Sequence, residues 1–280
     1  MEYMEYVDKL IEAGRPELAQ SLKQAWKNAV IFCEKEELKN KEIPVGASKI
    51  GGFPDLPPEI AYPEMSGFKR TWLRGHMKGE VEVVPESAMQ LMAQMNLYEL
   101  ADSGADVEQI LPKSGMLYFF YGHYGCDVFA EDNSPEPYDK IEVDTPEKAQ
   151  IDKVIYWDGD MTSLRRTKPE KPYCYGIMPC LEEETAIAFD YEDNYDIESL
   201  DDYEEILEIL EIDKHDLLPV SDKLLGIPWT VNPPDMSDDE INLLQMGDDE
   251  GSVVSDFWAI SKKDLADMNF SAARFWEDVD

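Results

Sequence analysis

The 280-residue sequence lacks a run of about 18 apolar residues, so it predicts no membrane-spanning helix. Its first ten residues, "MEYMEYVDKL", carry acids where a signal peptide carries Lys or Arg, and they hold no apolar segment. The four cysteines form no Cys-x-x-Cys pair, which favours reduced thiols in a chain of this size. Together these absences predict a cytoplasmic protein without a membrane anchor.

Basic residues are scarce as well. The chain has 25 Lys and Arg against 61 Asp and Glu, which gives a formal net charge of −36. Such a surface repels nucleic-acid phosphates and an acidic membrane leaflet, so we expect neither as a partner. Two interpretations of the charge stay open. It can provide solubility in a host whose proteins are generally acidic, or it can steer a basic protein partner toward the chain.

Sequence signatures of the common enzyme classes are also missing. There is no Gly-x-Ser-x-Gly motif, and only three histidines occur. Gly46 and Gly51 in "VGASKIGGFPDLPP" have the spacing of a phosphate-binding loop, but Gly-Phe follows Gly51 where that loop requires Lys and then Ser or Thr. Prolines 54, 57 and 58 exclude the helix that must come next. We therefore expect no phosphate site and no catalytic residue.

Metal-binding patterns are weak. His123, Cys126, Cys174 and Cys180 are suitable zinc ligands, but their spacings are irregular for a structural site, and "HYGC" is typical of a turn after a strand. The acidic segment 190–201 lacks the glycine and the terminal Glu of a calcium loop, so only adventitious calcium binding is expected there. The sequence predicts no cofactor and no dedicated metal site.

Apolar spacing predicts two N-terminal helices, over 3–13 and over Pro16–Leu38, the second about 22 residues long. After residue 43, short apolar runs bounded by glycine and proline predict strands. The segment 87–100 fits a helix or a strand, and acidic residues 200–211 fit an amphipathic helix. The strands are expected at residues 115–125, 152–157 and 185–191.

A short pattern occurs twice. "KIGGFP" begins at Lys49 and "KLLGIP" at Lys223, each followed by an apolar segment with one glutamine and then by an aromatic strand. Three matches in one order indicate an internal duplication with a trimmed second copy. We expect helices in residues 1–40 packed on one domain, 41–280, whose halves (about 41–160 and 161–280) are related by a pseudo-twofold axis.

The polar residues common to both copies are Lys49 and Gln94 in the first and Lys223 and Gln245 in the second. A buried glutamine needs hydrogen-bond partners, and the backbone of the neighbouring turn can supply them. The alternative is a polar pocket between the halves, formed by these four residues, which binds a small ligand or carries out a reaction. In either case the glycines of the turns (Gly51, Gly52 and Gly226) are expected to adopt backbone angles that other residues resist.

Residues 68–79, "FKRTWLRGHMKG", form the one basic island. We interpret this island as a loop that neutralises nearby acids. It can also bind an anionic group or an acidic patch on another chain.

These segments resemble a known family. "SKIGGFPDLPPEIAYP", "MQLMAQMNL", "DKLLGIPWTV" and "FWAISKKDLADMNFS" are similar, in this order, to motifs of the YwqG-like family, also called DUF1963, over roughly residues 16–275. The chain departs from the family at Tyr62, where Trp is frequent, and at residues 248–251, where Trp-Gly-Asp is common. The resemblance implies an α+β, mainly β fold with roll-like antiparallel sheets, an internal duplication and N-terminal helices. It implies no reaction, and some members occur in a context of bacterial toxin and immunity systems.

The sequence therefore predicts a non-enzymatic cytoplasmic binding protein that engages a basic protein, as an immunity-type factor does. The alternative is a small-ligand binder or enzyme that uses a cleft between the two halves. The oligomeric state is not predicted.

Overall fold

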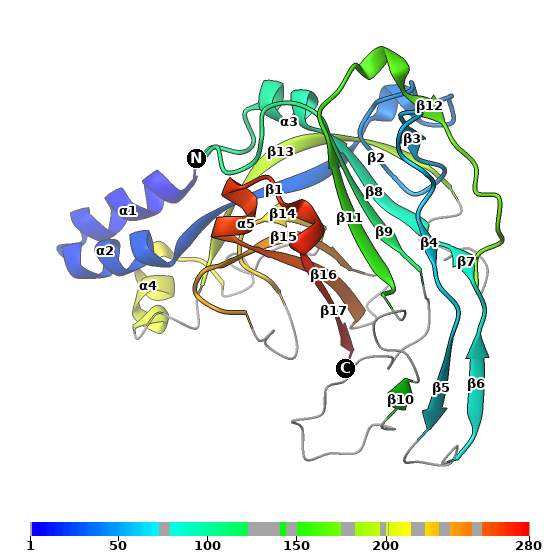
Figure 1. The fold of residues 1–280 in the computed structure, drawn as a ribbon. Coiled ribbons are helices and arrows are strands. Elements are labelled where there is room, and N and C mark those ends of the chain that lie inside the picture. The colour runs from blue at the N-terminus through cyan, green and yellow to red at the C-terminus, as the bar shows by residue number, and fades with distance from the viewer. Residues whose placement is uncertain are drawn as a thin grey trace. The chain divides into compact units, whose positions relative to one another are not determined.

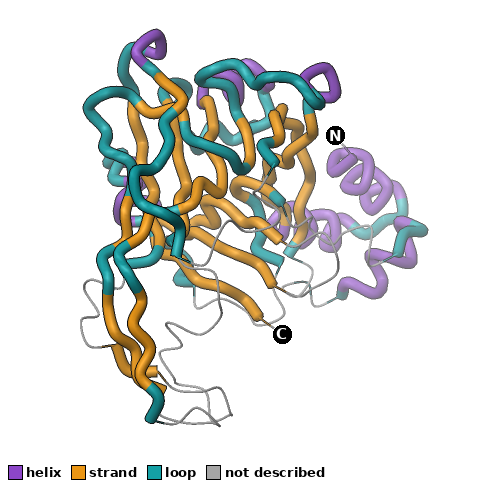
Figure 2. Tube along the Cα trace, turned by 90° about the vertical axis from the view of Figure 1, so that its right-hand side faces the viewer, coloured by secondary structure: helices purple, strands orange, loops and turns teal. Residues whose placement is uncertain are grey.

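The computed structural model describes residues 2–72, 79–122, 141–143, 150–174, 183–196, 200, 202–213, 222–229, 236–247 and 254–279. Strands dominate the described chain and helices are short (Figure 2), which confirms the α+β, mainly β fold class. The chain forms two compact units. Unit 1 comprises residues 1–33, 98–113 and 188–280, and unit 2 comprises residues 34–97 and 114–187.

Unit 2 is built around a sheet with the strand order β11-β9-β8-β2-β13. Its central strands β8 and β9 are buried along almost their whole length, and the aromatic run "MLYFFY" forms β9. Short pairs β3–β12 and β4–β7 and the three-stranded sheet β10-β5-β6 complete the unit. The strands are β2 (Lys49–Ile50), β3 (Asp55–Leu56), β4 (Glu64–Met65), β5 (Phe68–Trp72), β6 (Val81–Val84), β7 (Ser87–Ala88), β8 (Gln90–Asn96), β9 (Met116–Tyr121), β10 (Ile141–Val143), β11 (Asp152–Trp157) and β12 (Arg165–Arg166), with 3-10 turns at Glu36–Leu38 and Met161–Ser163.

Unit 1 has the strand order β13-β1-β14-β15-β16-β17. Strand β13 (Thr185–Tyr195) starts in unit 2 and its later residues belong to unit 1. The other strands are β1 (Trp26–Glu34), β14 (Lys223–Leu225), β15 (Glu240–Gly247), β16 (Val254–Ser261) and β17 (Arg274–Val279). The helices are α1 (Glu2–Glu12), α2 (Pro16–Ala25), α3 (Leu97–Ser103, all but its first residue in this unit), α4 (Tyr203–Leu210) and α5 (Lys262–Ala266), with a 3-10 turn at Phe270–Ala272.

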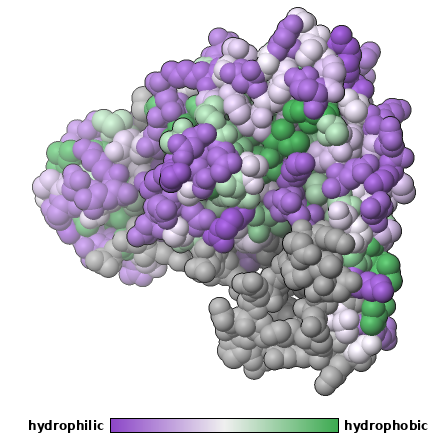
Figure 3. Space-filling model, in the orientation of Figure 1, coloured by the Kyte–Doolittle hydropathy of each residue, from purple (hydrophilic) through white to green (hydrophobic). Residues whose placement is uncertain are grey.

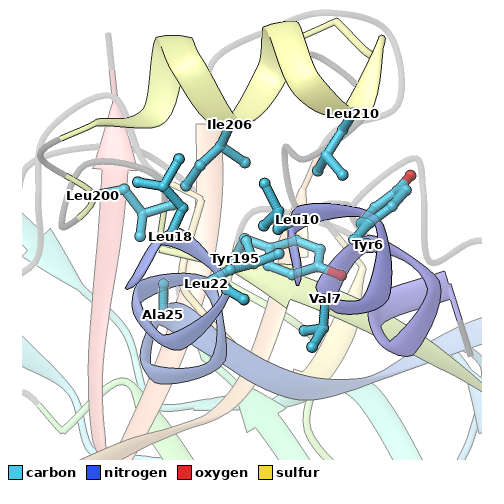
Figure 4. Close-up of a cluster of buried hydrophobic side chains, with 11 residues drawn as sticks. Tyr6, Val7, Leu10, Leu18, Leu22, Ala25, Tyr195, Leu200, Ile206 and Leu210 are labelled. Carbon is cyan, nitrogen blue, oxygen red and sulfur yellow. The ribbon is translucent and has the colours of Figure 1, made fainter. Parts of the chain in front are cut away.

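Helices α1, α2 and α4 of unit 1 lie together (Figure 1) and enclose a small hydrophobic core of their own. Ile206 and Leu210 of α4 point toward Leu10 of α1 and Leu18 of α2 (Figure 4). The amphipathic helix predicted at 200–211 is thus confirmed as α4. Ile206 and Leu210 are buried and Leu207 and Ile209 are partly buried against the same core, so Glu204 and Glu208 lie on the exposed side.

The second N-terminal helix is much shorter than predicted. Helix α2 ends at Ala25, and residues 26–34 form strand β1 instead of continuing to Leu38. Ala29 and Val30 are fully buried, and β1 has a neighbouring strand on each side, β13 and β14. A strand that is buried on both faces shows no alternation of apolar and polar residues. The apolar residues of β1 therefore matched the spacing of a helix.

The other predicted elements are largely present. The strands expected at 152–157 and 185–191 are β11 and β13, and the ambiguous segment 87–100 is both, since strand β8 leads directly into helix α3. The basic island is not a loop over its first residues, because Phe68–Trp72 is strand β5 and pairs with β6. Its residues 73–78 lie outside the described chain.

Candidate functional site

The two repeated lysine segments occupy equivalent places in their units. In unit 2, Lys49 of β2 is directly opposite Gln94 of β8. In unit 1, Lys223 of β14 is directly opposite Gln245 of β15. All four side chains are fully buried. The structure therefore places each lysine with the glutamine of its own copy.

Each lysine is followed by the same unusual turn. Gly51 and Gly52 both have φ of 68°, and the matching Leu225 and Gly226 have φ of 62° and 70°. Two consecutive left-handed residues turn the chain sharply, and glycine is the residue that does so without steric cost. The predicted backbone freedom of these glycines is confirmed. Leu225 was not predicted, and a bulky residue with positive φ is rare.

The glutamines hold these turns. Gln94 Oε1 accepts the N–H of Asp55 at 2.9 Å, and its Nε2 donates to the carbonyl of Ala47 at 2.8 Å. Gln245 Oε1 accepts the N–H of Trp229 at 3.0 Å, and its Nε2 donates to the carbonyl of the same residue at 2.8 Å. These bonds confirm the prediction that each glutamine binds the turn beside it. The pocket between the halves stays a prediction.

A β-bulge precedes each glutamine by the same distance. In β8 the register with β9 shifts between Leu91 and Ala93, and in β15 the register with β16 shifts between Asn242 and Leu244. A bulge re-aims the side chains that follow it. The correspondence of lysine, turn, bulge and glutamine supports the predicted duplication, which remains a hypothesis about the origin of the chain.

Unit 2 adds charged groups to this scaffold. Asp55 is fully buried, and its carboxylate accepts hydrogen bonds from the Gly46 N–H at 2.9 Å, Gln94 Nε2 at 2.8 Å and Arg166 Nε at 2.6 Å. The Gly46–Gly51 segment therefore binds a carboxylate of its own chain. This agrees with the sequence argument against a phosphate-binding loop there.

Arg166 links this carboxylate to a second one. Its Nη1 donates to both oxygens of Glu184 at 2.9 and 3.0 Å, and Lys49 Nζ donates to Glu184 at 2.6 Å and to the Phe53 carbonyl at 2.6 Å. Gly52 is required for this approach, because a Cβ at that residue would lie 2.6 Å from Glu184 Oε2. Burial lowers the pKa of Lys49, and the neighbouring Glu184 partly opposes that shift.

Unit 1 lacks the matching carboxylate. Thr185 of β13 pairs with Ile50 of β2, so the register places the preceding residue, Glu184, opposite Gly51. In unit 1, Leu225 takes the place of Gly51, and the residue opposite it is Ala29. A Cβ on Gly226 would lie 2.7 Å from the Ala29 Cβ, just as one on Gly52 would lie 2.7 Å from the Glu184 Cβ. Here burial lowers the pKa of Lys223 to about 7, and the carboxylate of Glu192 partly opposes that shift. The two lysines therefore have different surroundings: Glu184 and Arg166 lie beside Lys49, whereas Ala29 takes the place of Glu184 in unit 1.

Sequence reasoning missed three members of the unit 2 network: Asp55, Arg166 and Glu184. Asp55 follows the proline of the turn, but the second copy has Trp229 in that place, so the repeat gave no signal. Arg166 and Glu184 lie more than 100 residues away and belong to no motif. The charged side chains of the network form ion pairs with one another. This geometry supports a structural role in fixing the turn.

Several other predictions fall partly or wholly outside the described residues. His123, Cys126 and Cys180 of the possible zinc set are among the undescribed residues. Residues 190–195 of the acidic segment belong to strand β13 and do not form a loop. Within the described chain, no group of three potential ligands is arranged to hold a metal ion, and none of its helices is long and apolar enough to cross a membrane.

Unit 1 also has a pocket of about 350 Å³ lined by residues between Leu100 and Lys113. Its acid, Asp106, already accepts the N–H groups of Ile110 at 3.0 Å and Leu111 at 2.8 Å. The carboxylate therefore organises the loop that forms the wall, and the other two polar side chains of the lining bond to each other, since Lys113 Nζ donates to Gln109 Oε1 at 2.6 Å.

The chain is similar to one described protein family over most of its length. Residues 48–278 match the family described as "Domain of unknown function (DUF1963)". The chain therefore belongs to the DUF1963 family. No curated protein matches it.

Proposed function

We propose that this protein is a non-enzymatic, cytoplasmic binding protein of the YwqG-like type, which engages a basic protein through its acidic surface. The role closest to this is that of a bacterial immunity-type factor, which binds and neutralises its partner. The family context of toxin and immunity systems supports that role. The burial and internal bonding of Lys49, Gln94 and Gln245 support a structural task for these residues.

The observation that carries the proposal is the outer side of helix α4. Glu204 and Glu208 are four residues apart in α4, so they lie on one exposed face, and Glu211, which is also exposed, follows directly after the helix as its C-cap residue. None of the three has an ion pair among the described residues, whereas Glu205 pairs with Arg15. Like charges four residues apart destabilise a helix by about 0.2–0.5 kcal/mol. A basic partner would remove this repulsion.

The surface has the same character more widely. The face drawn in Figure 3 is largely hydrophilic, with hydrophobic patches over the α1–α2 end, at the upper part of the β8–β9–β11 region and beside β6. With a net charge of −36, a long-range attraction to cations is expected, and it should weaken steeply with salt.

The test is affinity capture from the native host at low ionic strength, followed by elution with increasing salt. The bait is the full chain, beside a variant in which Glu204, Glu208 and Glu211 are all replaced by Lys. A charge-matched control has three other exposed acids replaced by Lys: Glu37, Glu42 and Glu108.

We expect wild type and control to capture the same basic protein, and the α4 variant to lose it. Co-expression with the captured protein should relieve any toxicity that the latter has. Recovery of no basic protein, or equal loss with the control variant, would contradict the proposal.

A further inference from the structure

Helix α1 of unit 1 has a wider apolar face than its neighbours cover. Tyr6, Val7 and Leu10 are buried in the core shared with α2 and α4. Met4 and Ile11 adjoin Val7 on the helix surface, yet their side chains are 45% and 48% exposed. They are seven residues apart, so they form one ridge about two turns long.

The helix is held firmly in place. Asp193 of β13 accepts the Tyr3 N–H at 3.0 Å and the indole N–H of Trp26 at 2.6 Å. An acid at this end of a helix satisfies an otherwise unpaired N–H and interacts well with the helix dipole. The Tyr3 ring also stacks on Trp26 with centroids 4.9 Å apart. The ridge is therefore presented by a fixed helix, which lowers the entropic cost of binding.

Acids line the outer side of this ridge. Asp8 lies one turn from both Met4 and Ile11, and Glu5 and Glu12 follow on the exposed side. Lys9 of the same helix lies over the Tyr6 ring, with its Nζ 5.9 Å from the ring centroid. A second copy of this chain would bring the same acids against these, which disfavours self-association. Charge complementarity selects a cationic partner.

We propose that the α1 face formed by Met4, Asp8 and Ile11, with Glu5 and Glu12 beside it, is a docking surface for a basic amphipathic helix. This inference rests on the proposed function; it adds to the acidic side of α4 a second contact surface on the same unit and specifies a kind of partner. The apolar side of the incoming helix packs on Met4 and Ile11, and its Lys or Arg residues face the acids. One helix thus packs against another: Met4 and Ile11 are the apolar contacts, two turns apart, and Asp8 lies one turn from each.

The test uses two synthetic peptides of identical composition, roughly 14 residues of Leu and Lys. In one, the leucines share a helix face; in the other, they are scattered around it. Binding of each to the full-length protein is measured by fluorescence anisotropy at low ionic strength. Three proteins are compared: wild type, the double variant M4S/I11S, and the control V81S/V83S. The control removes two valines of β6 in unit 2 that are 59% and 64% exposed.

We expect wild type and control to bind the amphipathic peptide at least about tenfold more tightly than the scattered one. The M4S/I11S variant should lose this preference and still bind both peptides through charge. A preference that persists in M4S/I11S, or is absent in wild type, would overturn the docking site. Failure of both peptides to bind wild type would instead contradict the proposed function.

A second variant covers the case in which M4S/I11S does not fold, which circular dichroism would reveal. The variant Asp8→Lys keeps the apolar residues. It should weaken binding of the amphipathic peptide more than binding of the peptide with scattered leucines. An equal effect on both peptides would again overturn the site.

Discussion

Replacing Lys223 by methionine should stabilise the protein near neutral pH. The lysine is fully buried in unit 1, and burial lowers its pKa from 10.5 to about 7. The unfolded chain therefore binds a proton at this lysine more firmly than the folded chain does near pH 7. This lower proton affinity of the folded state reduces the free energy of unfolding by about 4 kcal/mol at pH 7. Methionine fills a similar volume without that cost.

The pH dependence gives the sign of the effect. Between pH 7 and pH 10.5 the unfolded state binds more protons at this lysine than the folded state, so wild-type stability rises with pH in this window. The cost is present in full below pH 7 and vanishes above pH 10.5. The advantage of Lys223→Met should be about 1–4 kcal/mol at pH 7, because some hydrogen bonding is lost with the amine. It should shrink steadily toward pH 10.

Urea denaturation of both proteins between pH 6 and pH 10 measures this difference. Other groups titrate alike in the two proteins, so the difference in unfolding free energy isolates Lys223. The matched control is Lys49→Met, which removes a lysine whose ammonium binds Glu184 and the Phe53 carbonyl. That change should cost about 1–3 kcal/mol, because it leaves the Phe53 carbonyl without the ammonium and Glu184 with Arg166 alone. Equal destabilisation by both substitutions, or a difference that does not change with pH, would refute the reasoning.

Two further predictions concern unit 2. Gly52→Ala should cost about 2–4 kcal/mol in thermal or urea unfolding, because its Cβ would lie 2.6 Å from Glu184 Oε2 at a positive φ. Gly14→Ala, at a positive φ with no atom within 4 Å, should cost only about 1–2 kcal/mol, and an equal loss would refute the steric part. Glu184→Ala should destabilise the protein and leave space for a small carboxylate between Lys49 and Arg166. Acetate should then raise the melting temperature of this variant more than chloride does at equal ionic strength, and no difference between the two salts would contradict this account of the network.

The parts of the fold that sequence predicted are those with local signals. The turns at Gly51–Gly52 and at Gly226 follow from glycine and proline spacing, and strand β11 from a short β-branched and aromatic run. Helix α4 follows from its apolar periodicity despite its acids. Strand β1 was missed because its middle residues 28–30 are buried on both faces of the sheet, which is a tertiary effect that a local pattern does not show.

The candidate site divides in the same way. The lysines and glutamines were found because they recur, and the bonding of Gln94 and Gln245 to the adjacent turns was correctly predicted. The residues that surround each lysine and differ between the two units were not predicted. Glu184 reaches Lys49 through strand pairing across 135 residues, and no residue spacing in the sequence encodes that contact. Likewise, the place of Ala29 opposite Leu225 is known only from the register.

The most direct test of the central claim is the salt-resolved capture of a basic protein on the full chain, on its Glu204/Glu208/Glu211→Lys variant and on the charge-matched control. The account predicts that wild type and control retain the same basic protein at low salt and release it as salt rises, while the α4 variant does not retain it. Capture of no basic protein by wild type would contradict the account.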